Sequence, residues 1–300
     1  MNVSPSVKEF LKEIRSDTLS GASQLAAKAA RLLLDFLRDG SEDELVLQTR
    51  TLSRALVDAQ PSMAPIVNLV NHLFRAIEGL NDSLEIKARG ISAIEVFLER
   101  LIKGAEGIRD YALPLLRGKR TLLTHSYSST VLGVLEHAQG VEVICTEARP
   151  LFEGTRTAKE LGKRGIKVRL VVDFAAFSLI RECDLVIVGA DAITPGGIVN
   201  KIGTYGLALA AKEEGVPFYA LAGKEKYLPS PFSYALRIDK HDPKEIIEEP
   251  IINGVVENFY FDLTPLYLIS GVVTQDGVMS GQEAQESLDK MEISKELTGL

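Results

Sequence analysis

Between residues 118 and 223, short apolar segments alternate with helical patterns, and this alternation restricts the fold more than any other feature. The apolar segments are RTLLTH (120–125), VEVICT (141–146), VRLVV (168–172), DLVIV (184–188) and PFYALA (217–222). The helical patterns between them cover 130–138, 157–164, 177–182 and 205–214. Short, nearly continuous apolar strands that alternate with helices indicate a parallel sheet covered on both faces. We therefore predict a doubly wound, Rossmann-like sheet.

Residues 6–112 show a different pattern, in which apolar residues recur every three or four positions. The first run predicts one apolar helix face, made of Leu25, Ala29, Leu32, Leu33 and Phe36. Ser41 and Glu44 have the spacing of a capping box for a second helix, which Gln60–Pro61 should end near Ala59. Further helices are expected over 65–78 and 82–103.

The change of pattern near Gly118 predicts an α/β chain with two domains. Residues 1–115 would form a helical domain, and residues 116–300 a Rossmann-like ligand-binding domain, which is a reasonable division for 300 residues. The segment 252–281 is less regular, and we expect one or two strands there. Residues 282–300 resemble a polar helix and tail.

The composition argues against several classes of protein. Lys and Arg total 34 and Asp and Glu 41, so the net charge is −7, whereas nucleic-acid binders are usually basic. No apolar stretch approaches the roughly 20 residues of a membrane span. The first residues lack the pattern of a secretory signal, so we expect a cytoplasmic protein. Cys145 and Cys183 lack metal-ligand spacing, and we expect buried thiols, no metal and no cofactor.

Polar residues follow the predicted strands, where a doubly wound sheet binds its ligands. They occupy positions 124–129, 146–150, 173, 189–191 and 223–224, and together they would line a mixed-charge cleft. Each also has a structural interpretation. His125 could bond to the backbone, Asp191 could form a turn, and Glu147 could pair with Arg149. Helix caps are the corresponding interpretation for Ser128, Ser129 and Asp173.

One further group of residues suggests an anion site. The sequence has no GxGxxG fingerprint after the first strand and no phosphate-binding P-loop, and Gly196–Gly197 is typical of a hairpin. Asn200, Lys201, Gly203 and Thr204 come just before a predicted helix. An amide, an ammonium, a glycine and a hydroxyl ahead of a helix N-terminus suit a phosphate or a carboxylate.

Four runs of sequence together resemble one superfamily: SGASQLAAKAA (20–30), LLTHSYSSTVLGVLEHA (122–138), TEARPLFEGTRTAKEL (146–161) and GADAITPGGIVNKIGTYGLALAAKEEGVPFYALAG (189–223). It comprises the α, β and δ subunits of translation initiation factor 2B, methylthioribose-1-phosphate isomerase and ribose-1,5-bisphosphate isomerase. The resemblance covers nearly the whole chain. It implies a helical domain followed by a Rossmann-like domain, and homodimers or higher homo-oligomers.

The resemblance also implies roles for individual residues. The isomerases use an aspartate and a cysteine to open a ring-form aldose 1-phosphate and convert it into a ketose. The aspartate matches Asp191, but the cysteine position holds Ser126. A hydroxyl is a far weaker acid than a thiol, and His125 beside it should point to the opposite face of an extended segment.

Phosphate-binding positions of the family are partly kept. Gly21, Ala22, His125, Ser128, Arg149, Asn200 and Lys201 are the candidates for ligand or phosphate binding. Two arginines that serve the isomerases are replaced, by Ser20 before Gly21 and by Gln60 before Pro61. The loss removes bidentate phosphate donors, so the pocket should hold an anion placed differently, or a single phosphate.

Two hypotheses follow. In the first, the protein is regulatory, like the translation factor subunits: it binds a sugar phosphate or a nucleoside monophosphate and contacts a protein partner, for which a translation initiation factor is the candidate. In the second, it is an aldose–ketose sugar-phosphate isomerase that uses Asp191 with Ser126 in place of the family cysteine. The serine and the missing arginines favour the first; the retained Asp191, Asn200 and Lys201 keep the second open.

Overall fold

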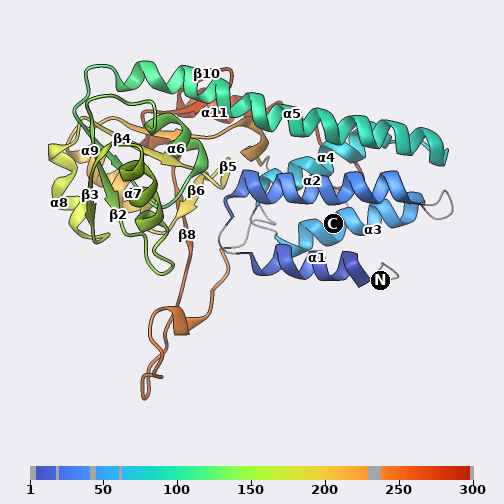
Figure 1. Cartoon of the computed structure of the whole chain (residues 1–300), viewed down its shortest axis with the longest axis horizontal. Coiled ribbons are helices and arrows are strands. Elements are labelled where there is room, and N and C mark those ends of the chain that lie inside the picture. Colours follow the sequence, from blue (N-terminus) through green and yellow to red (C-terminus); the bar gives the residue numbers. More distant parts are fainter. Residues whose placement is uncertain (1–4, 18–19, 41–44, 61–62, 229–237, 298–300) are drawn as a thin grey trace.

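The computed structural model describes residues 5–17, 20–40, 45–60, 63–228 and 238–297. A layer of helices occupies one end of the molecule and a sheet flanked by helices the other (Figure 1). The helical layer consists of α1 (Pro5–Ser16), α2 (Ala22–Asp39), α3 (Leu45–Ala59), α4 (Ala64–Ile77) and the first part of α5 (Ser83–Leu116). The predicted helical region and the predicted Rossmann-like sheet are both confirmed.

The main sheet has seven strands in the order β10-β9-β7-β4-β1-β2-β3, and all neighbours are parallel except β9 and β10. These strands are β1 (Thr121–Thr124), β2 (Glu142–Thr146), β3 (Lys167–Val171), β4 (Leu185–Gly189), β7 (Phe218–Leu221), β9 (Gly271–Thr274) and β10 (Gly277–Met279). Central strand β4 is buried along its whole length. That explains its continuous apolar sequence, since helices cover both faces.

Two apolar clusters separate the faces of this sheet. Leu122 and Leu123 are adjacent on β1 but belong to different clusters, because successive side chains of a strand point to opposite faces. One face is covered by α8 (Ala175–Leu179), α9 (Thr204–Glu213) and α11 (Gly281–Asp289). The other is covered by α6 (Ser129–Leu135), α7 (Glu153–Lys163) and the last part of α5.

A small antiparallel sheet joins the two ends of the molecule. It contains β5 (Ala192–Thr194), β6 (Gly197–Lys201) and β8 (Phe261–Thr264) in that order. The predicted hairpin is the turn between β5 and β6, where Gly197 has a φ of 139° that favours glycine. Ala192 and Val199 pack into the core of the helical layer, while Ile193 and Ile198 pack into the core under the main sheet.

Several predicted boundaries were wrong. The 252–281 segment holds three strands, not one or two: β8 is a mixed polar and apolar strand that gives no clear signal, and β10 is three residues long. Helix α5 extends beyond the predicted end at 103 to residue 116, because Ile108, Ala112 and Leu116 pack against the main sheet. Helix α7 begins at 153, earlier than the predicted 157. The predicted Ser41–Glu44 capping box and Pro61 lie outside the described residues.

Helix α7 depends on one glycine. A Cβ on Gly154 would overlap the carbonyl oxygen of Thr146, at the end of β2. We predict that Gly154→Ala lowers the free energy of unfolding by about 2–3 kcal/mol, because neither backbone segment can withdraw without breaking its hydrogen bonds. Urea denaturation measures this change.

Gly162 on the same helix is the matched control. A Cβ there would meet no atom within 4 Å, so Gly162→Ala should leave stability unchanged or raise it by about 0.5–1 kcal/mol. Equal effects of the two substitutions would contradict the overlap at Gly154.

Candidate functional site

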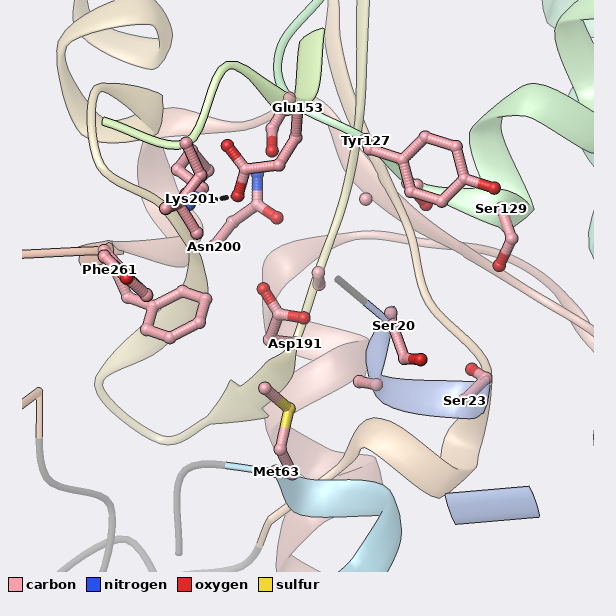
Figure 2. A pocket seen from close by; sticks show the side chains of 18 of the residues that line it. Ser20, Ser23, Met63, Tyr127, Ser129, Glu153, Asp191, Asn200, Lys201 and Phe261 are labelled. Atoms are coloured by element: carbon pink, nitrogen blue, oxygen red, sulfur yellow. Dashed lines mark ion pairs between the residues drawn. The ribbon is translucent and has the colours of Figure 1, made fainter. Parts of the chain in front are cut away.

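A cavity of about 410 Å³ lies between the helical layer and the carboxyl ends of the main sheet's strands. Its wall comes from the starts of α2 and α4, from the loops after β1, β2 and β4, from the end of β6, and from the segment before β8. Figure 2 shows Asp191 in this cavity, with Glu153, Asn200 and Lys201 on one side of it and Ser20, Ser23 and Met63 on the other. Ligand sites of doubly wound sheets occur at this edge.

The position of Asp191 depends on close packing after β4. A Cβ on Gly189 would lie 2.6 Å from Oγ of Ser128, so this strand end requires glycine. The backbone N–H of Asp191 then donates to Val199 O at 2.8 Å, which starts the β5–β6 hairpin. Burial raises the pKa of Asp191, whereas Lys226 and Lys201 oppose that rise. Asp191 therefore has the turn-forming role that was its structural interpretation, and its carboxyl group also faces the cavity.

Lys201 and Asn200 lie at the end of β6, and both line the cavity. The Lys201 ammonium is buried and lies 2.5 Å from Oε1 of Glu153, which is the first residue of α7. It also lies 4.7 Å from the ring centroid of Tyr260. The Asn200 amide donates to Thr204 Oγ1 at 3.0 Å.

The N-terminus of α9 holds a carboxylate from the protein itself. Oδ2 of Asp262, on β8, accepts hydrogen bonds from Gly203 N at 2.7 Å and Tyr205 N at 3.1 Å. The sequence predicted that a phosphate or a carboxylate would bind at this helix N-terminus. The group that occupies it is a carboxylate, and it belongs to Asp262 of the same chain. Asn200 and Lys201 line the cavity, and Asn200 also keeps its hydrogen bond to Thr204 at the start of α9.

Ser126 lines the cavity, but His125 lies outside its lining. Ser126 has a φ of 65°, so this segment is not extended as predicted. The His125 ring makes the backbone contact that was its structural interpretation: Nε2 donates to Ile202 O at 2.9 Å, and Nδ1 lies 2.6 Å from Thr146 Oγ1. Burial lowers the pKa of His125. With both nitrogens engaged, the ring cannot activate Ser126.

Two more candidates have structural partners. The Ser128 hydroxyl caps α6 by accepting from Val131 N at 3.3 Å, and Ser128 also lines the cavity. Arg149 lies outside the lining, where its guanidinium donates to Ile246 O at 3.4 Å and lies 4.8 Å from the Phe152 ring centroid. The proposed pairing with Glu147 is not among the ion pairs of the described residues.

The interpretation of Asp173 as a helix cap was wrong. Its carboxylate accepts from the N–H groups of Ala148 and Arg149, at 2.7 and 2.8 Å, and so fixes the loop after β2. That contact crosses between two strand ends that lie 24 residues or more apart in sequence, which no local capping pattern predicts.

Gly21 and Ala22, two of the predicted ligand-binding residues, line the cavity at the start of α2. The residues that replace the family arginines line it too, without bringing a charge. Ser20 N donates to Asp17 Oδ1 at 2.8 Å, and the Gln60 amide donates to Ile14 O at 2.7 Å. Gln60 thereby connects the end of α3 to α1, whereas the Ser20 contact is local.

Five charged residues of the lining were missed by the sequence analysis: Arg15, Asp17, Glu153, Arg156 and Lys226. Lys226 is buried on a short helical turn, Lys224–Lys226, and it forms no ion pair within the described part of the chain. The polar residues predicted to follow the fifth strand end at 224, before the turn that brings Lys226 back to the cavity. Arg156 stacks at 3.9 Å on the Tyr127 ring, and no spacing rule singles it out.

The model of the Initiation factor 2 subunit family matches residues 18–281 of this chain. The chain belongs to the Initiation factor 2 subunit family. It is 32% identical over 295 residues to the ribose 1,5-bisphosphate isomerase of Methanocaldococcus jannaschii. The matched region covers 95% of this chain and 94% of that protein. The family includes isomerases and translation factor 2B-like proteins, so membership leaves both classes of function open.

Solved structures of the family have the same fold. The translation initiation factor eIF-2B of Pyrococcus horikoshii OT3 matches with a TM-score of 0.80 and 32% identity, over 93% of this chain and 98% of that chain. The 5-methylthioribose 1-phosphate isomerase of the same organism matches with a TM-score of 0.74 and 25% identity, over 95% of this chain and 86% of that chain. No helix of the described segments is long and apolar enough to cross a membrane.

Asp262 should make stability depend on pH. Burial raises the pKa of Asp262 from 3.8 to about 6. The hydrogen bonds from Gly203 N and Tyr205 N favour the charged carboxylate and oppose this rise. Because the folded state binds this proton more tightly than the unfolded state, the stabilisation is complete below about pH 4 and is lost as pH rises through about 6.

The non-titrating variant Asp262→Asn isolates this effect. The free energy of unfolding of the wild type relative to the variant should fall by about 1–2 kcal/mol between pH 4 and 7. Urea denaturation across this range measures it, and a difference independent of pH would contradict the role of Asp262.

Proposed function

We propose that this member of the family is a regulatory protein that binds a phosphorylated sugar or a nucleoside monophosphate in the cavity without converting it. The observation that carries the proposal is the side chain at position 126, where the cavity wall presents a hydroxyl. The fold and the ligand cavity of the family are kept, while the thiol that the isomerase reaction requires is replaced.

No other group supplies the missing thiol. Burial raises the pKa of Cys145 to about 12 and that of Cys183 to about 11, and neither cysteine lines the cavity. An unactivated serine hydroxyl is far too weak an acid to exchange protons near neutral pH. His125 is held by Thr146 and Ile202 and cannot serve as its base.

The charges around the cavity favour one phosphate group. Lys226 is buried beside the cavity without an ion pair among the described residues, and Arg15 and Arg156 line the cavity as well. Lys201 is already paired with Glu153, and Ser20 and Gln60 stand where the isomerases have arginines. A single phosphate, with Lys226 as its buried cation, is therefore the ligand group that we propose.

The alternative is an aldose–ketose isomerase, and Asp191 is the observation that favours it. Its carboxyl group faces the cavity near two lysines, and its raised pKa suits proton transfer. In that case Asp191 would carry the acid–base work with Ser126 as a weak partner.

We also propose, from family membership, that the protein forms a homodimer or a higher homo-oligomer and is cytoplasmic. Residues 238–260 form an arm that projects from the sheet (Figure 1), and Ile252 and Val255 on it are 91% and 84% exposed. Such exposed apolar residues suit a protein contact, with a second copy of the chain or with a translation initiation factor.

Lys226→Ala should weaken binding of ribose 5-phosphate or AMP by about tenfold or more, because it removes a buried cation from the cavity. Isothermal titration calorimetry measures the affinity. Lys224→Ala is the matched control: Lys224 lies on the same helical turn but outside the cavity lining, paired with Asp276. Equal affinities of wild type and Lys226→Ala would contradict the assigned phosphate position.

Wild-type protein should leave ribose 1,5-bisphosphate and methylthioribose 1-phosphate unchanged, because the cavity lacks a thiol. Phosphorus and proton NMR after prolonged incubation would detect a ketose product. Asp191→Asn is the control for a contaminating enzyme. A ketose formed by the wild type and absent with Asp191→Asn would establish the isomerase alternative.

A further inference from the structure

A second cleft, of about 730 Å³, lies beside the short helical turn Lys224–Lys226. Its walls come from α4, from α5, from this turn, from the loop between β9 and β10, and from the segment after α11. Lys224 and Glu225 line the cleft, whereas Lys226 lines the cavity, and the two linings share no residue. The cleft is therefore a separate space from the proposed ligand site.

Two buried asparagines of α4 fix the walls of this cleft. The Asn68 amide donates to the carbonyl group of Glu225 at 2.7 Å and so holds the short helical turn against α4. Asn71 holds the segment after α11: its amide donates to Glu292 O at 3.0 Å, and its Oδ1 accepts from Ser294 N at 2.8 Å. A site whose walls are fixed in advance loses little conformational freedom when a ligand binds.

His72 of α4 and Arg100 of α5 line the cleft with polar groups that are not used within the described chain. Neither side chain forms a hydrogen bond or an ion pair with a described residue. Neither ring nitrogen of the half-buried His72 is a buried atom without a partner, so both are accessible. Burial lowers the pKa of His72, and Arg100 and Arg75 lower it further, which places both guanidinium groups near the imidazole. The ring is therefore a neutral donor beside two cations.

The acidic residues of the cleft leave Arg100 without a counter-charge. Three of them are already in ion pairs: Glu99 with Lys103, Asp276 with Lys224, and Glu292 with Arg75. The fourth is Glu225, whose buried carboxyl group hydrogen-bonds to Ser23, a residue of the cavity lining. Burial also raises the pKa of Glu225, which favours its uncharged form. An anion that enters the cleft thus meets Arg100 as a cation without a partner.

Apolar side chains lie next to these donors. Val96, Phe97 and Leu101 of α5 and Met291 line the same cleft. The ring centroid of Phe97 lies 6.4 Å from that of His72, so the apolar and polar parts of the lining adjoin. A mostly apolar lining with a few convergent polar groups is typical of small-molecule sites.

We propose that this cleft is a second ligand site, which binds a phosphate monoester with an apolar body. The guanidinium group of Arg100 binds the phosphate oxygens, His72 donates a further hydrogen bond, and the apolar body packs against Phe97 and its neighbours on α5. A phosphate suits these donors better than a carboxylate does, because it carries more negative charge and offers three oxygens to groups on two helices.

Proton–carbon NMR of the histidine rings measures binding in this cleft, because the chain has four histidines and His72 is the one in the cleft lining. The His72→Gln variant identifies its signal. Phenyl phosphate is the probe, and its titration should move the His72 signal to saturation. Inorganic phosphate, which lacks the apolar body, and benzoate, which lacks the phosphate, should each bind about tenfold more weakly or worse.

Arg100→Gln should weaken phenyl phosphate binding by about tenfold or more, because it removes the cation. Arg89→Gln is the matched control: Arg89 lies on the same helix, outside the cleft lining, paired with Glu85. This control and Lys226→Ala, which alters only the cavity, should leave the titration of His72 unchanged. That result also separates the cleft from the proposed function, which Lys226→Ala tests.

A His72 signal that does not move, or equal affinities of wild type and Arg100→Gln, would overturn the site. Benzoate bound as tightly as phenyl phosphate would overturn the assignment to a phosphate, and inorganic phosphate bound as tightly would overturn the apolar body. Arg100→Lys gives a second check that keeps the charge: it should bind more weakly than wild type because an ammonium lacks the guanidinium fork.

Discussion

Helix α5 packs against both ends of the molecule, and the cavity depends on this double contact. Its first part contributes Ile86, Ile94 and Phe97 to the core of the helical layer, and its last part contributes Ile108 and Leu116 to the core on the face of the main sheet that α6 and α7 cover. One continuous helix thus fixes the helical layer relative to the strand ends. The start of α2 is held opposite the loops after β1, β2 and β4, and the cavity is the space enclosed between them.

The small antiparallel sheet adds a second connection and carries much of the chemistry. Its β5–β6 hairpin follows Asp191, ends at Asn200 and Lys201, and packs into two different cores. Strand β8 brings Asp262 to the start of α9. Because that helix end is filled by the protein's own carboxylate, an anionic ligand has to be held by side chains of the cavity, of which Lys226 is the most buried cation without an ion pair among the described residues.

The predicted site and the observed site overlap in part, and physical reasons explain the difference. Asp191 and Ser126 were identified because they follow strands, and parallel strands end at one edge. Asn200 and Lys201 were identified because they come just before a predicted helix. Lys226 and Glu153 come from a later turn and from a helix start, and only packing decides which way those segments face. His125 and Arg149 had the right residue types, yet their hydrogen bonds to Ile202 and Ile246 were beyond any local pattern.

The sequence by itself determined the class of fold, the order of its helices and strands as far as β7, and the edge at which polar residues gather. These follow from apolar periodicity, glycines and proline, which act over a few residues and can be recognised in a single chain. Only the tertiary structure decided which charges meet. The pairing of Lys201 with Glu153, the capping of α9 by Asp262 and the approach of Lys226 to Asp191 join residues from 35 to 59 positions apart. Such contacts depend on how complete elements pack.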